Sequence, residues 1–350
     1  MRHDHDASAA MLEQVNYALN ERIALRIQGG NTKVGIGRKV KGEVLDTRSH
    51  RGIVSYDPTE LVITARAGTP LMEIAAALDA SGQMLPFEPP HLGVGATLGG
   101  MVAAGLSGPR RPWAGSVRDY VLGTRVITGH GKHLRFGGEV MKNVAGYDLS
   151  RLLAGSFGCL GVLTEVSLKV LPKPRKCLSL RLEMTEQQAL AQLAEWGQQP
   201  LPISGASHEN DVLHLRLEGG EGSVESACQR LGGELLDNDY WDTLREHRLA
   251  FFDIPQPLWR LSLPINTPSL DLPGAQLLDW AGAQRWLKSD APDDVIRMAA
   301  AERGGHATRY GVCAAPFAPL PAPLMRYHVS LKKKLDPQGI FNPGRMYADY

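Results

Sequence analysis

The chain has 350 residues, and its 38 Lys and Arg residues nearly balance its 37 Asp and Glu residues, giving a formal net charge of +1 at pH 7. This balance gives no reason to expect nucleic acid or an anionic membrane surface as a partner. Residues 1–25 carry charges where a secretory signal needs an apolar stretch, and no run approaches the roughly 18 apolar residues of a membrane span. We therefore expect a cytoplasmic protein with two domains.

Cysteine usage does not suggest a metal centre. The four cysteines do not form any CxxC pair, so the sequence predicts neither a zinc site nor an iron–sulfur cluster. We expect four free thiols and no bound metal: Cys159, Cys177, Cys228 and Cys313.

The first half of the chain has the pattern of an α+β domain. Short runs rich in β-branched residues predict strands, and Leu71, Ile74, Ala75 and Leu78 predict one face of a helix. Thr69 is the expected N-cap of that helix, with Pro70 at its first position. The expected strands cover residues 23–28, 43–47, 61–68, 121–128, 132–138 and 162–171.

The second half begins after a Pro-punctuated boundary at 171–176. Its pattern predicts the order β-α-β-β-α-β over 178–237, with a Thr185/Gln188 capping box opening the first helix. A looser echo of the same order follows over 258–312, and the two halves could share one sheet. A helix and a cap rich in Pro and Gly end the chain.

The stretch "IQGGNTKVGIG" at 27–37 is typical of a phosphate-binding turn, but it fits neither common dinucleotide motif. GxGxxG spacing is absent, and Ile36 and Gly37 stand where a P-loop needs Lys and then Ser or Thr. The following residues resemble a strand, whereas a Rossmann site needs a helix there. Two interpretations remain: a nest of backbone N–H groups aimed at a pyrophosphate, or a plain surface turn.

Two further stretches, 89–123 and 141–166, are also dense in small residues. In the first, Thr97 introduces a helix of Gly, Ala and Val, and in the second, Asp148 caps a helix that leads to three glycines. Small side chains let either a flat ligand or another backbone approach closely, so tight helix packing is an alternative explanation.

Taken together, these stretches resemble the FAD-binding domain of the vanillyl-alcohol oxidase family, also named after p-cresol methylhydroxylase (PCMH). The segments "QGGNTK", "TLGGMVAAGLSG", "GSVRDYVLG" and "KNVAGYDLSRLLAGSFGCLGVLTEV" carry the resemblance, and "LDPQGIFNPGRM" matches its glycolate oxidase and D-lactate dehydrogenase branch. The resemblance implies an α+β fold in three parts. These are a two-subdomain PCMH-type FAD-binding domain (1–174), an α+β cap domain derived from a ferredoxin-like unit (175–325), and a tail that returns to the FAD domain (326–350).

The resemblance also implies the cofactor and its contacts. We expect noncovalent FAD, because the pyrophosphate loop offers Asn31 where covalent members of the family carry His or Cys, and Cys159 stands where relatives carry an ordinary residue. Lys142 and Asn143 match the family's "KN" before the helix on the flavin side, and we expect them to serve in packing and positioning. The expected FAD contacts are Gly29, Gly30, Asn31, Thr32, Lys33, Thr97, Gly99, Gly100, Ala103, Gly105, Gly115, Ser116, Val117, Asp119, Gly161 and Val162.

For function, the resemblance implies an FAD-dependent oxidoreductase that oxidises glycolate, a 2-hydroxy acid, to glyoxylate. It further implies a heteromeric complex with two partners, a larger FAD-binding subunit of glycolate oxidase and an iron–sulfur subunit. Because this sequence shows no anchor of its own, any association with the inner membrane is expected to be peripheral and to depend on those partners.

The sequence departs from the larger relatives at the expected substrate site. Their "GHxGDGN"-like metal pair and "EHG"-type motif are both missing. A 2-hydroxy acid needs a cation for its carboxylate and a base for its hydroxyl proton, and we name Arg110, His306 and Arg309 as candidates. The odd separation of His306 and Arg309 would place them on opposite faces of a strand.

Three interpretations of activity therefore stay open. The chain catalyses the oxidation within its complex, it relays electrons or supports a larger catalytic paralogue without catalysing the reaction, or it is a stand-alone D-2-hydroxy acid dehydrogenase. UDP-N-acetylenolpyruvoylglucosamine reductases share a similar fold and length, but "VAGYDLSRLL" and "DPQGIFNPG" argue against that assignment.

Overall fold

The computed structural model describes residues 4–138 and 148–350, so Lys142 and Asn143 lie outside the described residues. The chain divides into two compact units. The first unit comprises Met1–Ser107, Ser116–Pro172 and Pro319–Tyr350, and the second comprises Gly108–Gly115 and Lys173–Ala318.

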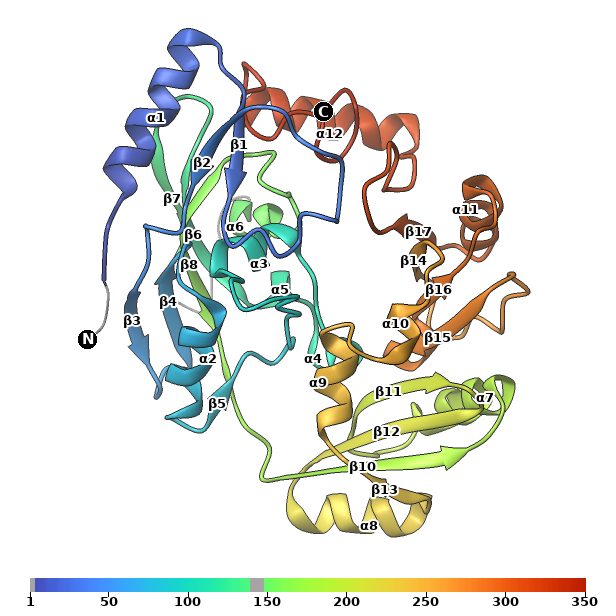
Figure 1. Ribbon diagram of the computed structural model, residues 1–350. Coiled ribbons are helices and arrows are strands. Elements are labelled where there is room, and N and C mark those ends of the chain that lie inside the picture. Colours follow the sequence, from blue (N-terminus) through green and yellow to red (C-terminus); the bar gives the residue numbers. More distant parts are fainter. Residues whose placement is uncertain (1–3, 139–147) are drawn as a thin grey trace. The chain divides into compact units, whose positions relative to one another are not determined.

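The first unit is built on a five-stranded antiparallel sheet in the order β3-β4-β8-β6-β7. β8 lies at its centre between β4 and β6, and both β4 and β8 are almost entirely buried. The strands are β3 (Ile53–Asp57), β4 (Val62–Arg66), β6 (Val121–Ile127), β7 (His133–Gly137) and β8 (Val162–Lys169) (Figure 1). The hairpin expected at 121–138 and the strand expected at 162–171 are confirmed.

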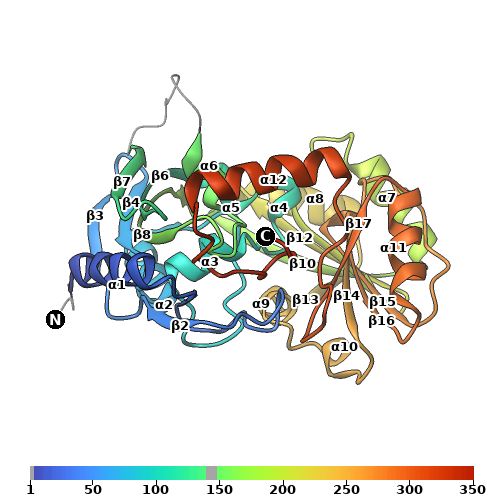
Figure 2. The ribbon, with the colours of Figure 1, turned by 90° about the horizontal axis from the view of Figure 1, so that it is seen from above.

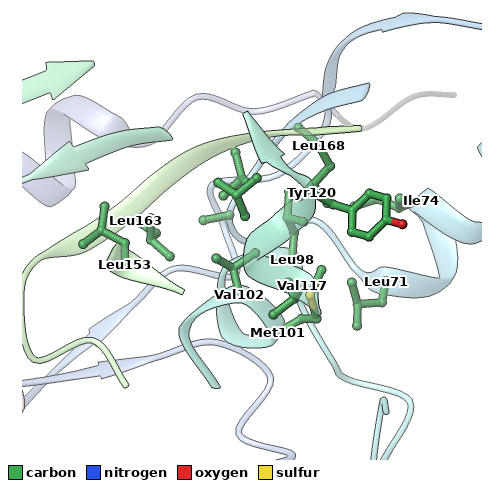
Figure 3. Close-up of a cluster of buried hydrophobic side chains, with 14 of the residues drawn as sticks. Leu71, Ile74, Leu98, Met101, Val102, Val117, Tyr120, Leu153, Leu163 and Leu168 are labelled. Atoms are coloured by element: carbon green, nitrogen blue, oxygen red, sulfur yellow. The ribbon is translucent and has the colours of Figure 1, made fainter. Parts of the chain in front are cut away.

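Apolar faces of short helices build the core against this sheet. Leu71 and Ile74 of α2 (Leu71–Asp79) pack with Met101 and Val102 of α3 (Leu98–Ala104) in one buried cluster (Figure 3). Val117 and Tyr120 of α5 (Val117–Tyr120) and Leu153 of α6 (Leu149–Leu153) belong to the same cluster. Fully burying each such aliphatic side chain contributes about 1.5–3 kcal/mol.

A second cluster in the first unit joins the two ends of the chain. β1 (Leu25–Gln28) and β2 (Glu43–Asp46) form a parallel pair, and α1 (Ser8–Glu21) packs on it together with Ile340 and Phe341. The tail begins with α12 (Ala322–Leu335), which Figure 2 shows in red. Its buried Lys332 donates to the Asp336 carboxylate and to the carbonyl groups of Cys159 and Phe341.

The second unit contains one eight-stranded sheet in the order β13-β10-β12-β11-β15-β16-β14-β17. Its first half has the expected order β-α-β-β-α-β, and Thr185 and Gln188 form the expected capping box. The two halves share one sheet through β11 and β15. The strands are β10 (Lys176–Glu183), β11 (Ile203–Glu209), β12 (Val212–Gly219), β13 (Glu234–Leu236), β14 (Leu258–Ser262), β15 (Ala275–Asp279), β16 (Gln284–Lys288) and β17 (His306–Arg309).

The two faces of this sheet carry different helices, because successive residues of a strand point to opposite faces. Leu213 and Leu215 pack in the cluster of α7 (Glu186–Trp196) and α8 (Glu221–Leu231). On the other face, Arg216 lies over the ring of Trp241 in α9 (Asp239–Arg245). The remaining long helix, α11 (Asp293–Glu302), packs with the cluster that contains Leu261 and Leu287 (Figure 1).

Two details differ from the sequence-based expectation. Thr69 does not cap α2; Pro70 holds that position, and the Thr69 hydroxyl instead bonds to the backbone of Gly52. Several short elements were not predicted, because their few residues show no measurable period. These are β3, β5 (Gln83–Met84), β9 (Leu171–Pro172), α4 (Arg111–Ala114), α5 (Val117–Tyr120), α9, α10 (Ala250–Asp253) and the 3₁₀ turn at Trp280–Gly282.

Candidate functional site

The glycine turn lies between β1 and β2, so a strand and not a helix follows it, as the sequence predicts. The backbone N–H groups of Gly30, Asn31 and Thr32 have no hydrogen-bond partner in the described part of the chain. Asn31 has a positive φ of 60° and is exposed, whereas Gly30 and Thr32 are half-buried. Adjacent backbone donors without protein partners suit an anion, and a phosphate group can accept from several of them at once.

This turn packs tightly against a second small-residue segment, which precedes α3. A Cβ on Gly30 would overlap the carbonyl oxygen of Gly95, so only glycine allows the two backbones to approach. Thr97 caps α3 by accepting from the N–H of Gly100 at 3.3 Å, and Gly99 donates its N–H to Ala67. The N–H groups of Gly99 and Gly100 are therefore satisfied by the protein, and these residues contribute space to the site.

The third small-residue segment meets the end of α3. Gly105 ends that helix with φ of +67°, and a Cβ there would lie 2.7 Å from the Cα of Gly155. The N–H of Gly155 bonds to Val102, and the N–H of Phe157 bonds to Ala103. The structure thus brings together three segments that are far apart in the sequence, all within the first unit.

A residue from the tail links the first and third segments. The Asn342 side chain accepts from the N–H of Ile27 at 2.8 Å and donates to the carbonyl of Phe157 at 2.7 Å. Its own N–H bonds to Leu25. Asn342 was missed as a site residue, although it stands in the stretch "FNPGRM", which belongs to one of the segments that carry the family resemblance.

A hollow of about 410 Å³, counting its solvent-open part, lies where these segments meet. Its walls are mostly glycine, alanine and aliphatic groups, with Thr47 and Asn342 as polar members. Its lining includes five of the predicted FAD contacts: Gly29, Gly99, Gly100, Ala103 and Gly161. No periodic pattern in the sequence marks the others, which meet only in the fold: Ile27, Thr47, Ala67, Phe157, Gly158, Leu163 and Asn342.

Other predicted contacts lie outside this lining. Ser116 and Asp119 form a capping box on α5, with the Ser116 N–H donating to the Asp119 carboxylate at 2.8 Å. Burial acts to raise the pKa of Asp119, but the hydrogen bonds from Ser116 outweigh it and the pKa is lowered. The N–H of Val117 bonds to the Ser107 hydroxyl, and Val162 is fully buried in β8. Gly115 ends α4.

Lys33 is held within the loops themselves. Its ammonium group donates to the carbonyl of His91 at 2.9 Å and to the Thr32 hydroxyl at 3.2 Å. The bond from Lys33 to His91 is a second contact between the glycine turn and the segment before α3, in addition to the one between Gly30 and Gly95.

Cys159 is an unsuitable attachment point for a ligand in this arrangement. Its side chain is fully buried, its thiol contacts the carbonyl of Asn342 at 3.7 Å, and burial raises its pKa to about 11. A thiol with so high a pKa is a weak nucleophile near neutral pH. Within residues 4–138 and 148–350, no group of three His, Cys, Asp or Glu side chains could hold a metal ion.

The three candidate catalytic residues lie in the second unit, and two of them are engaged in ion pairs. Arg110 is mostly buried and pairs with Glu218 at 2.6 Å, and Arg216 approaches the same carboxylate at 3.4 Å. Arg309 pairs with Asp293 at 2.8 Å.

His306 and Arg309 do not form a site together. Arg309 lies over the Trp259 ring beside α11, whereas His306, three residues earlier on β17, is exposed on the other face of the sheet. Their separation on opposite faces agrees with the odd spacing in the sequence.

Comparison with known proteins identifies the class of domain in the first unit. Residues 7–137 match the family described as the FAD binding domain, so the first unit carries an FAD-binding domain. The solved structure of an alkyldihydroxyacetonephosphate synthase has the same fold, with a TM-score of 0.65 at 16% identity over 97% of this chain and 74% of that one.

Two curated relatives define the family more closely. This chain is 63% identical over its full length, and over the full length of the relative, to "Glycolate oxidase subunit GlcE" of Escherichia coli strain K12. It is 36% identical to "Glycolate oxidase subunit GlcD" of Bacillus subtilis strain 168, over 38% of this chain and 28% of that protein. The chain belongs to the family of the glycolate oxidase subunit GlcE. Among its described residues, no helix has the length and hydropathy to cross a membrane.

Proposed function

We propose that this chain is an FAD-binding subunit of a glycolate oxidase complex, which oxidises glycolate to glyoxylate. The observation that carries the proposal is the hollow in the first unit, with unpartnered backbone N–H groups beside it. The full-length similarity to GlcE supports the substrate and the complex.

The hollow and the glycine turn, whose Gly29 lines it, fit FAD in two ways. The N–H groups of Gly30, Asn31 and Thr32 would bind the pyrophosphate, and the absence of side chains at Gly99 and Gly100 would let the rest of the dinucleotide lie against α3. FAD supplies the redox chemistry when it is bound. We propose noncovalent binding, because no His or Cys lines the hollow among the described residues.

The domain boundaries that we propose are those that the family resemblance implies. We propose that the first unit corresponds to a two-subdomain PCMH-type domain of residues 1–174 with the returning tail 326–350, and the second to a cap domain of residues 175–325. All the predicted FAD contacts stay predictions, including those that line the hollow. The ones outside its lining are Gly30, Asn31, Thr32, Lys33, Thr97, Gly105, Gly115, Ser116, Val117, Asp119 and Val162.

Within the complex, we propose that electrons pass from this chain to partner subunits. The expected partners are a larger FAD-binding subunit of glycolate oxidase and an iron–sulfur subunit, and the similarity to GlcD supports the first of them. Association with the inner membrane would then depend on these partners.

A second candidate function is electron relay or support of a larger catalytic paralogue. The ion pairs of Arg110 with Glu218 and of Arg309 with Asp293 favour it. In each pair the carboxylate occupies N–H donors of the arginine and offsets its charge, which weakens its attraction for the carboxylate of a substrate. Neither arginine is therefore prepared to bind glycolate in this arrangement.

A titration separates the two functions. The purified chain is loaded with FAD, and glycolate is added without oxygen, first alone and then with the larger FAD-binding partner. Bleaching of the flavin absorbance by glycolate alone supports independent catalysis, and bleaching only with the larger partner supports relay. A chain that does not bind FAD at all contradicts both.

A further inference from the structure

The side chain of Arg345, in the C-terminal tail, donates hydrogen bonds to several carbonyl groups of the glycine-rich loop, which lies more than 300 residues earlier in the chain. Its Nη1 donates to the carbonyl of Arg38 at 2.8 Å. Its Nη2 donates to Ile36, and at 3.3 and 3.4 Å to Lys33 and Val34. In return, the backbone N–H of Arg38 bonds to the carbonyl of Arg345. One guanidinium thus fixes residues 33–38, which directly follow the unpartnered N–H groups.

The loop is shaped around this guanidinium. Gly37 has φ of +91°, and a Cβ there would lie 3.0 Å from Nε of Arg345. Gly35, two residues earlier, has nothing within 4 Å of the position of its Cβ. The loop therefore approaches the tail closely at Gly37, which faces Arg345, and not at Gly35.

Arg345 lacks a compensating negative charge. It is half-buried, and it forms no ion pair with Asp or Glu in the described part of the chain. The guanidinium stays charged at any pH at which the protein is folded. A partly buried cation that bonds only to neutral carbonyl groups retains its full charge for an anion that binds nearby.

We propose that Arg345 is a positioning residue for the pyrophosphate of FAD. It holds four carbonyl oxygens of the loop, those of Lys33, Val34, Ile36 and Arg38, whose partial negative charge would repel a phosphate. It thereby leaves the N–H groups of Gly30, Asn31 and Thr32 to face the ligand. Its positive charge is balanced by the bound pyrophosphate. This inference rests on the proposed function, because it concerns the same FAD site.

The test uses the full-length chain prepared without flavin. FAD and ADP are titrated into wild type, Arg345→Gln and Arg345→Lys. Arg125→Gln is the matched control, because Arg125 is an exposed arginine of the same unit and the change in net charge is equal. We expect Arg345→Gln to lose at least about 30-fold in affinity for both ligands, Arg345→Lys to recover part of the loss, and Arg125→Gln to change by less than about twofold.

Two further measurements separate positioning from a general loss of structure. The affinity for riboflavin, which has no phosphate, should change less than threefold in Arg345→Lys, and the ³¹P resonances of bound FAD should move in that variant and not in Arg125→Gln. If both Arg345 variants bind FAD within threefold of the wild-type affinity, the inference is overturned and the proposed function stands. If Arg345→Gln does not fold, the FAD affinity of Arg345→Lys decides whether the inference holds. A wild-type chain that binds no FAD overturns the proposed function as well.

Discussion

Two arginines of the second unit differ from Arg345 of the first unit in their partners. In the second unit, Arg110 and Arg309 are each neutralised by a carboxylate, whereas Arg345 in the first unit contacts only carbonyl groups. The first unit also keeps backbone N–H groups without partners, among the described residues, beside a hollow of small side chains. The first unit is therefore organised to receive an anionic ligand, and the candidate cations of the second unit stabilise its own fold.

The largest expected effect concerns the contact between two loops of the first unit. Gly30→Val should weaken FAD binding at least 100-fold, about 2.7 kcal/mol, because the side chain overlaps Gly95 and forces the loops apart. FAD titration of the purified variant measures it. Gly35→Ala is the matched control, since its Cβ meets open space. If both variants bind FAD as wild type does, the loop is not part of the site.

In the second unit, we expect a loss of stability without a loss of FAD affinity. Glu218→Gln leaves Arg110 and Arg216 mostly buried beside a neutral amide, and breaking a buried ion pair typically costs about 3–5 kcal/mol. Urea unfolding should show this loss, and FAD affinity should change less than threefold. A large loss of FAD affinity at unchanged stability would assign Arg110 and Glu218 to the ligand site instead.

The second unit should also lose stability in mild acid. Burial lowers the pKa of both His214 and His247 to about 4, below the ordinary value of 6.5, so the unfolded chain binds protons that the folded chain does not. Stability is therefore full above pH 6.5 and falls as the pH falls toward 4. Lowering the pH from 7.5 to 5 should cost about 2 kcal/mol for each histidine.

Urea unfolding at the two pH values measures this effect. His214→Gln should remove about half of the combined acid-dependent loss, because only His247 then contributes. An unchanged pH dependence in that variant would show that His214 does not titrate as its burial implies.

The smallest expected effect is at a helix cap. Thr185→Ala removes the hydroxyl that accepts from the N–H of Gln188 and should cost about 1 kcal/mol in urea unfolding. Thr185 is exposed and belongs to the second unit, so FAD affinity should not change. A loss of stability below about 0.2 kcal/mol would show that water replaces the cap without cost.

Much of the fold follows from local patterns in the sequence. The strand β8, the capping box of α7 and the order of the second unit's first half were all predicted correctly, because each depends on neighbouring residues. Thr69 was assigned wrongly as a cap because its hydroxyl has a distant partner in Gly52, which local spacing does not reveal.

The residues of the candidate site also differ in whether local patterns predict them. Its glycine-rich segments are visible in the sequence, since each is locally unusual. Asn342 and Arg345 were not predicted, because their partners Ile27 and Arg38 lie more than 300 residues away. In the second unit, the sequence indicated Arg110 as a candidate for binding substrate, and only the fold places Glu218 against it.

The most direct test of the account is a crystal structure of this chain with FAD bound. We predict that oxygen atoms of the pyrophosphate lie about 3 Å from the backbone nitrogens of Gly30, Asn31 and Thr32, within hydrogen-bond distance. FAD bound elsewhere, or bound with these three N–H groups still without partners, would contradict the account.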